Sequence, residues 1–258
     1  MSVLFDGLSL GAIYALIALG YTMVYGIAKM LNFAHGDIIM VGAYAIFVTL
    51  SMGGHVAIAL VASIVVCTVV GILIEKVAYK PLRGSSPLAV LITAIGVSYF
   101  LQSIAQLVFG AKAQSVSLPS LGAIELFGTK ISLSSVVTLV VGAIIMAVLT
   151  VFVKKTKTGR AMVAVSEDRG AAQLMGINVN KIIMITFAIG SALAACASIF
   201  YLLQIPTAEP TLGSMPGIKA FTAAVIGGIG SIPGAMIGGV LLGVIEKVCL
   251  SVPVLAPY

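Results

Sequence analysis

Long apolar runs separated by short polar segments make up most of this chain. A run of roughly 20 uncharged, apolar residues is long enough to cross the hydrocarbon core of a bilayer as one helix. The pattern therefore predicts an all-α integral membrane protein, a single transmembrane domain over residues 1–258 with about 7–8 transmembrane helices. The apolar runs cover 7–28, 38–52, 56–75, 88–109, 131–153, 182–205 and 218–250.

The second run, 38–52, is short for a transmembrane helix. Because a crossing needs roughly 20 residues, part of the preceding segment KMLNFAHGD is expected inside the bilayer or at its edge. That placement brings Asn32, His35 and Asp37 to membrane depth, where polar groups are costly and typically mark a substrate path or a relay. The alternative is a cytoplasmic turn in which Asp37 caps the next helix.

The last run, 218–250, is interrupted by the glycine-rich segment GGIGSIPG at 227–234. Irregular backbone is tolerated in a membrane only against protein or a water-filled cavity. We therefore expect a re-entrant or broken helix here, with a break that lines a pathway. Elsewhere, glycines four residues apart, such as Gly7 with Gly11, predict closely packed helices.

The composition supports a membrane protein and excludes a soluble domain. Charged residues make up only 9% of the chain, against about 25% in a soluble domain. The 14 Lys and Arg exceed the 8 Asp and Glu, which in a soluble chain would suggest nucleic-acid binding. Here the basic residues gather at 76–83 and 154–181, between apolar runs, as is typical of cytoplasmic loops. Nucleic acid is therefore not an expected partner, and the N-terminus is expected on the extracytoplasmic side.

The sequence pattern does not favour an enzyme. The cysteines Cys67, Cys196 and Cys249 are odd in number and lie in apolar runs, which does not support a disulfide framework or a zinc site. The segment GGIGSIPG lacks the Lys followed by Ser or Thr of a P-loop. A membrane-embedded enzyme would need a cluster of intramembrane acids or histidines. We therefore expect no catalytic residue, no metal site and no cofactor bound by this chain.

The polar segment 154–181 is longer than a minimal connection between helices. After KKTKTGR it continues as AMVAVSEDRGAAQLMGI, with Glu167 and Asp168 beside Arg169 and with Gly176 as a helix stop. This pattern predicts a short amphipathic helix or a helix pair. One interpretation is an interfacial helix that rests on lipid headgroups. The acids that interrupt its basic face favour instead a docking element for a soluble partner.

Several long motifs resemble one known family. GLSLGAIYALIALGYTMVYGI, followed by NFAHGD and GAYAIF, resembles the N-terminal signature of bacterial branched-chain amino acid ABC importer permeases. The resemblance continues through EKVAYKPLRGSSPLAVLITAIGVS, GRAMVAVSEDRGAAQLMGINVNKIIMITFAIGSALAA and MPGIKAFTAAVIGGIGSIPGAMIGGVLLGVIE, and so covers nearly the whole chain. Of the two related membrane subunits in such importers, the chain is similar to the H-type subunit.

The resemblance implies the ABC importer permease fold and a role in moving branched-chain, hydrophobic amino acids across a bacterial inner (plasma) membrane. The implied partners are a second permease, related or identical, two cytoplasmic ATPases that bind ATP and Mg²⁺, an extracytoplasmic substrate-binding protein and the lipid bilayer. The permease itself is expected to alternate access without enzymatic activity.

The resemblance also implies roles for residues of the cytoplasmic loop, because 159–176 matches the family's coupling segment, which fits into a cleft on the ATPase. The acids are expected to pair with basic groups of the ATPase, while small and apolar side chains supply further contacts and Gly176 ends the helix. The expected coupling residues are Gly159, Arg160, Glu167, Asp168, Ala171, Leu174 and Gly176.

The translocation path is expected to bind its cargo weakly, because few charges lie in the apolar runs. Brief contacts would come from polar side chains and from backbone groups at a helix break, where half-helix ends carry partial charges. The expected path residues are Tyr21, Tyr25, Asn32, His35, Gly227, Gly228, Gly230 and Gly234.

Two other functions remain open on the sequence. An autonomous carrier driven by protons or sodium would use His35 and Asp37 as an ion relay, but it would need no docking element such as 154–181. A permease of the same family that moves urea or another amino acid would share most of the motifs. Family members usually continue beyond the position of Glu246 with another apolar helix and a tail containing Pro-Gly, whereas this sequence ends in SVPVLAPY, which leaves the C-terminal topology open.

Overall fold

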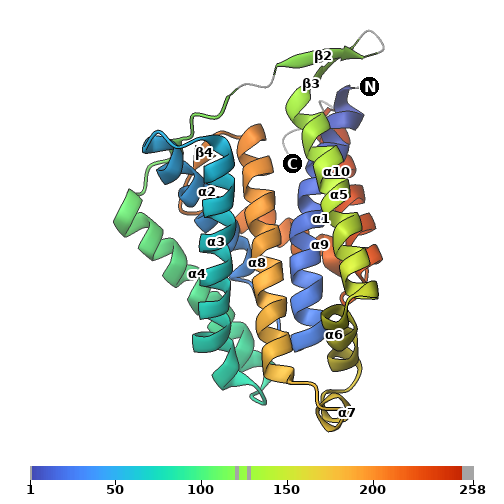
Figure 1. The fold of residues 1–258 in the computed structure, drawn as a ribbon. Helices are drawn as coiled ribbons and strands as arrows, with labels where there is room; N and C mark the ends of the chain where they lie inside the picture. Colours follow the sequence, from blue (N-terminus) through green and yellow to red (C-terminus); the bar gives the residue numbers. More distant parts are fainter. Residues whose placement is uncertain (1, 120–121, 127–128, 252–258) are drawn as a thin grey trace.

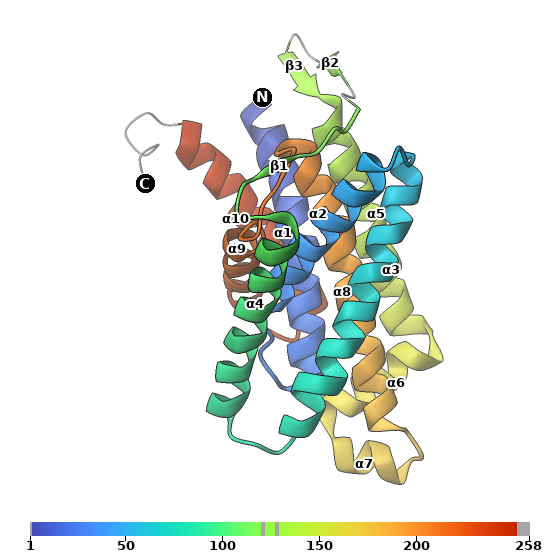
Figure 2. The same cartoon turned by 90° about the vertical axis from the view of Figure 1, so that its left-hand side faces the viewer.

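The computed structural model describes residues 2–119, 122–126 and 129–251. The long helices run up and down along a common direction, and the short strands lie at one end of the bundle (Figures 1 and 2). The helices are α1 (Ser2–Ala28), α2 (His35–Ser51), α3 (Val56–Ile74), α4 (Pro87–Phe109), α5 (Leu133–Lys155), α6 (Lys157–Glu167), α7 (Arg169–Leu174), α8 (Val179–Gln204), α9 (Ser214–Ile226) and α10 (Ile232–Ser251).

Two single turns and two strand pairs complete the described fold. A π-helical turn, η1 (Glu75–Tyr79), and a 3-10 turn, η2 (Lys80–Leu82), extend α3. Both strand pairs are antiparallel and were not predicted from the sequence. They are β1 (Gln114–Ser115) with β4 (Thr207–Ala208), and β2 (Ala123–Leu126) with β3 (Thr129–Ser132).

Helix ends coincide with capping residues at the edges of the apolar runs. Ser86 Oγ accepts a 3.3 Å hydrogen bond from the Ala89 N–H, and Pro87 occupies the first turn of α4. Gly110, with a φ of +83°, ends the same helix. The polar boundaries that delimit the apolar runs are therefore also the residues that stop and start the helices.

In the part of the chain that the structure describes, six helices are long and apolar enough to cross a membrane, and they correspond to six of the apolar runs. These helices are α1, α3 with its extension, α4, α5, α8 and α10. Helices α2 and α9 are shorter. The prediction of a predominantly helical, multi-pass membrane protein is thus confirmed.

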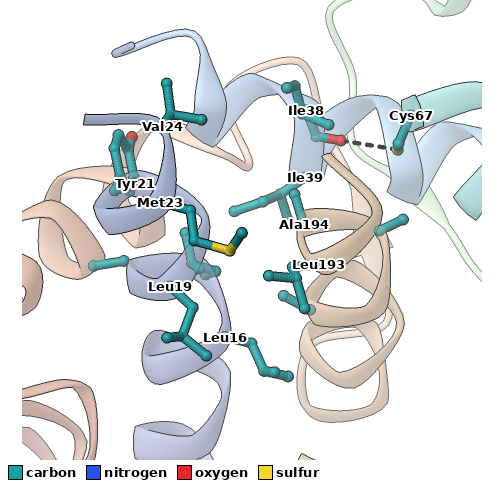
Figure 3. Close-up of a cluster of buried hydrophobic side chains, with 14 of the residues drawn as sticks. Leu16, Leu19, Tyr21, Met23, Val24, Ile38, Ile39, Cys67, Leu193 and Ala194 are labelled. Carbon is teal, nitrogen blue, oxygen red and sulfur yellow. Dashed lines mark hydrogen bonds between the residues drawn. The ribbon is translucent and has the colours of Figure 1, made fainter. Parts of the chain in front are cut away.

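The buried core lies around α1 and α8. Leu16, Leu19 and Met23 of α1 face Leu193 and Ala194 of α8 across a continuous apolar layer (Figure 3). On the far side of this layer the buried Cys67 thiol lies 3.4 Å from the Ile38 carbonyl oxygen (Figure 3), so this cysteine packs between helices.

Small residues let α1 and α10 approach closely, as the glycine spacing predicts. A Cβ at Gly11 of α1 would lie 2.7 Å from the Cα of Val240, and a Cβ at Gly243 of α10 would lie 2.3 Å from the Cα of Gly11. Close backbone contact strengthens the van der Waals attraction between the two helices. In lipid this attraction matters, because burying apolar side chains against another helix gives no hydrophobic free energy. These glycines therefore have a packing role.

Both basic segments lie at the same end of the bundle. Arg83, just after η2, forms an ion pair with Glu75 and hydrogen-bonds Asn180 at the start of α8. Helices α6 and α7 lie at this end too, opposite the N-terminus and the β2–β3 hairpin (Figure 1). The two basic segments therefore share one end of the bundle, as expected if both are cytoplasmic loops.

Candidate functional site

The N-termini of α2 and α9 meet inside the bundle instead of at its ends. His35, the first residue of α2, lies beside Gly190 near the middle of α8, because a Cβ at Gly190 would lie 3.6 Å from His35 Cε1. Gly36 lies against Gly213, the residue before α9, since a Cβ at Gly36 would lie 2.6 Å from the Gly213 carbonyl oxygen. Glycine at both positions permits a backbone crossing that larger residues would obstruct.

From this meeting point the two helices run toward opposite ends of the bundle. Helix α2 ends beside β4, at the end that holds the strands (Figure 1). Helix α9 leads to Gly230, where an added Cβ would lie 3.8 Å from the Cα of Gly26, near the other end of α1. The interior therefore contains two half-length helices whose positive N-terminal ends come together.

Two of the expected path residues are packed at this point. The buried His35 ring meets Tyr21 edge-on, with centroids 4.8 Å apart, and among the described residues its Nε2 has no hydrogen-bond partner. The buried Asn32 accepts a 2.8 Å hydrogen bond at Oδ1 from the Tyr79 hydroxyl. Neither residue is among the residues that line the largest of the five described cavities, which has a volume of about 470 Å³. Their role in translocation stays a prediction.

A cavity of about 470 Å³ lies next to the meeting point, between α1, α2, α4 and α9. Asp37 lines it, and Asp37 Oδ1 accepts a 2.8 Å hydrogen bond from Gln102 Nε2 of α4. The same nitrogen lies 3.3 Å from Ser98 Oγ and 3.3 Å from Ser214 Oγ. The apolar part of the wall includes Phe33, Leu91, Ile95 and Ile218.

The residues that surround Asp37 were missed by sequence reasoning. Gln102 and Ser98 are two of several polar residues within an apolar run, and Ser214 lies in a polar connection. The available signal was weak: a Gln within a transmembrane run is an unsatisfied polar group unless another helix supplies a partner. Periodicity alone does not say which helix that is.

His35 and Asp37, the pair that an ion-driven carrier would use as a relay, contact different parts of the described structure. They lie two residues apart on α2, and their side chains meet different neighbours: His35 packs on Gly20, whereas Asp37 bonds Gln102. In the described ranges no hydrogen bond joins the two side chains.

The expected path glycines form the turn between α9 and α10. Gly227 and Gly234 are in direct contact, since a Cβ at Gly234 would lie 1.8 Å from the Gly227 carbonyl oxygen. Gly228 and Gly230 have φ values of +86° and +98°, a region that favours glycine. The run 218–250 is therefore broken here, and the break is shaped as a tight turn.

The expected path residues do not gather around one cavity. Tyr21 borders the cavity beside Asp37, and Tyr25 borders another one of about 250 Å³. Gly230 borders a third, of about 210 Å³, together with Glu167 at the end of α6. The structure thus separates residues that the sequence analysis placed in one group.

The segment 154–181 folds as a helix pair, the second of the two predicted forms. Asp168 lies between α6 and α7 and caps α7, because its Oδ1 accepts hydrogen bonds from the N–H groups of Gly170 (2.7 Å) and Ala171 (3.0 Å). Gly176, with a φ of +80°, follows α7 and ends it, as expected.

The coupling residues divide into buried and exposed ones. Gly159 packs α6 onto α5, since a Cβ there would lie 2.4 Å from the Phe152 carbonyl oxygen. Arg160, Glu167 and Ala171 are exposed. Beside them Leu174 and the unpredicted Met175 are 91% and 82% exposed. Leu174 and Met175 are adjacent, so together they present an exposed apolar pair at the end of α7.

Arg169 ties the helix pair to α1, a role that the sequence did not indicate. Its Nη2 donates hydrogen bonds to the carbonyl oxygens of Ala28 and Ile27, at the end of α1. Burial, followed by the positive charge of Arg83, lowers the pKa of the Arg169 guanidinium, which nonetheless stays protonated near neutral pH. A cation suits the carbonyl end of a helix. Arg169 therefore links the helix pair directly to the end of α1.

Comparison with known proteins identifies the family. A family model described as the permease component of the branched-chain amino acid transport system matches residues 3–254. The chain belongs to this permease family. The resemblance noted in the sequence motifs is thereby confirmed, and the relatives of this permease are transport proteins and not enzymes.

Individual relatives of the permease show the same relationship. The high-affinity branched-chain amino acid transport system permease protein BraD of Pseudomonas aeruginosa is 46% identical over 257 residues, which cover 94% of this chain and 84% of BraD. The corresponding LivH protein of Escherichia coli K12 is 45% identical over 259 residues, 94% of this chain and 83% of LivH. The ribose import permease RbsC of Haemophilus influenzae matches only 41% of this chain, at 33% identity. No solved structure matches the chain.

Proposed function

We propose that this chain is the transmembrane permease subunit of an ATP-driven importer of branched-chain, hydrophobic amino acids. The observation that carries the proposal is the helix pair α6–α7 at the basic end, with Leu174 and Met175 exposed. A carrier that works alone has no need of such a docking element. The substrate class is that in the names of the relatives BraD and LivH.

In this proposal the chain crosses a bacterial inner membrane eight times. The six long helices make one crossing each, and α2 and α9 complete two more together with the non-helical segments 29–34 and 205–213 that precede them. The basic end faces the cytoplasm, so the N-terminus is extracytoplasmic. Transporters commonly place their pathway at such broken helices, which favours the meeting point of α2 and α9.

Energy enters through the partners and not through this chain. Two cytoplasmic ATPases bind ATP and Mg²⁺, and their closure moves α6–α7 through contacts with Leu174 and its neighbours. Arg169 passes the movement to the end of α1, which continues into the segment before α2. A second permease, related or identical, completes the transporter. An extracytoplasmic binding protein supplies most of the affinity for the amino acid.

The proposal is tested on the transporter assembled with its ATPases and binding protein in proteoliposomes. The double change Leu174→Ser with Met175→Ser removes the exposed apolar pair. We expect ATP hydrolysis stimulated by the loaded binding protein to fall together with amino acid uptake, by about tenfold or more, because burying one such side chain contributes roughly 1.5–3 kcal/mol.

The matched control is Met52→Ser. Met52 is 83% exposed, close to the value for Met175, but it lies in the turn between α2 and α3. This variant is expected to keep both activities. Normal coupling in the double variant, or uptake by the isolated chain under an ion gradient alone, would contradict the proposal.

A further inference from the structure

We propose that Asp37, held by Gln102, binds the α-ammonium group of the amino acid in the cavity between α1, α2, α4 and α9. This inference rests on the proposed function and adds a substrate-recognition site to it. Asp37 is the one charged residue among the described residues that line the cavity. A single negative group beside an apolar wall complements an apolar amino acid at its ammonium end.

Asp37 lacks the positive partner that a buried carboxylate normally has. It is 2% exposed, and the two ion pairs found among the described residues, Arg83 with Glu75 and Lys219 with Glu246, lie elsewhere. Acidic side chains at membrane depth are usually paired. The first turn of α2 offsets part of the cost, because a helix N-terminus favours negative charge. A substrate ammonium supplies the missing cation.

Gln102 orients this carboxylate without neutralising it. Its Nε2 holds Asp37 Oδ1 at 2.8 Å and also lies 3.3 Å from Ser214 Oγ, in the first turn of α9. An amide donor fixes one oxygen of the carboxylate and leaves the negative charge in place.

The rest of the cavity suits an aliphatic side chain. Its volume of about 470 Å³ lies in the range of about 300–1,000 Å³ that is common for small-molecule sites. Leu91, Ile95 and Ile218 contribute apolar surface. Because only one ion pair forms, binding is weak enough for release, as a transport path requires.

The site is tested by protection of an introduced thiol in the assembled transporter. Ile95→Cys places a thiol on the cavity wall, in a background without the native cysteines, and a small maleimide measures its reactivity. Leucine and 3-methylbutylamine, which carry the ammonium group, are expected to slow labelling severalfold at millimolar concentration. 4-Methylpentanoate has the same aliphatic chain without the ammonium, and it is expected not to protect. Ile104→Cys is the matched control, because Ile95 and Ile104 are 42% and 41% exposed on the same helix and Ile104 lies outside this cavity.

Asp37→Asn is the decisive variant. It keeps the size of the side chain, so assembly with the ATPases is expected to persist. Protection by leucine is expected to be lost. Uptake is expected to fall by about tenfold, because that factor corresponds to the free energy of one hydrogen bond to a charged group. Equal protection by 4-methylpentanoate, or full protection and uptake in Asp37→Asn, would overturn the ammonium site. Absence of any protection in a transporter that still couples ATP hydrolysis to uptake would also overturn it and would leave the proposed function standing. Failure of the unaltered chain to couple with ATPases would refute the function itself.

Discussion

At the scale of single residues, Gly36 shows how little space separates the two half-length helices. A Cβ at this position would lie 2.6 Å from the Gly213 carbonyl oxygen, and a carbonyl of the backbone cannot move aside as a flexible side chain can. The close approach therefore depends on the missing Cβ of Gly36. The position of Asp37, one residue later, depends on it too.

Gly36→Ala is expected to destabilise the protein by about 1–3 kcal/mol, the usual cost of overpacking a tight contact. Gly96→Ala is its matched control, because Gly96 also lies inside a helix but an added Cβ meets nothing within 4 Å. There alanine should leave stability unchanged or raise it slightly. Thermal unfolding of both variants in detergent measures the difference, and equal midpoints would show that the crossing is not tight.

The same scale shows where sequence reasoning about the site stopped. Asp37 and Asn32 were placed at membrane depth because they are polar residues next to a short apolar run, and both are buried in the structure. Their partners were not predicted, since Asp37 and Gln102 are 65 positions apart and no pattern in one sequence pairs them. Periodicity shows that a side chain faces the interior, but not which side chain it meets there.

At the scale of elements, two adjacent acidic residues at the junction of α6 and α7 differ in role: one caps a helix, and the other is exposed. The sequence analysis assigned Asp168 to contacts with a partner ATPase, yet its Oδ1 already accepts two backbone hydrogen bonds from α7. Glu167, one residue earlier, is exposed and ends α6. Adjacent acids that look equivalent in the sequence therefore differ in what they contact.

Asp168→Ala is expected to lower coupling between ATP hydrolysis and uptake, because loss of a cap costs about 0.5–2 kcal/mol and loosens α7. Asp168→Asn keeps a capping oxygen without the charge and is expected to retain coupling. The measurement is the ratio of amino acid transported to ATP hydrolysed in the assembled transporter. Equal loss in both variants would show that the charge itself binds the partner and that the cap is secondary.

Elements were predicted more reliably than their connections. The apolar runs anticipated the six long helices, and the glycine-rich segment anticipated the interruption between α9 and α10. The β1–β4 pair was missed because each strand has two residues, too few to show alternation. The entry of α9 at the middle of the bundle was missed too, because the direction of a short helix depends on contacts such as Gly36 with Gly213.

At the scale of the whole molecule, the number of crossings decides which loops share a side of the membrane. Between Met52 and Met175 lie three long helices, α3, α4 and α5, so these two exposed residues must lie on opposite sides. Between the exposed Leu4 and Met52 lie α1 and the shorter α2. Leu4 and Met52 share a side only if α2, with the segment before it, completes a crossing.

The arrangement is tested by labelling single cysteines with a membrane-impermeant maleimide in intact cells, in a background without the native cysteines. Leu4→Cys and Met52→Cys are expected to react from outside, because the basic end that holds Met175 faces the cytoplasm. Met175→Cys is expected to react only after the membrane is opened. Labelling of Met52→Cys but not Leu4→Cys from outside would make α2 a re-entrant helix, since α1 alone would then separate the two positions. Labelling of Met175→Cys in intact cells would instead invert the whole topology and remove the docking surface from the reach of an ATPase.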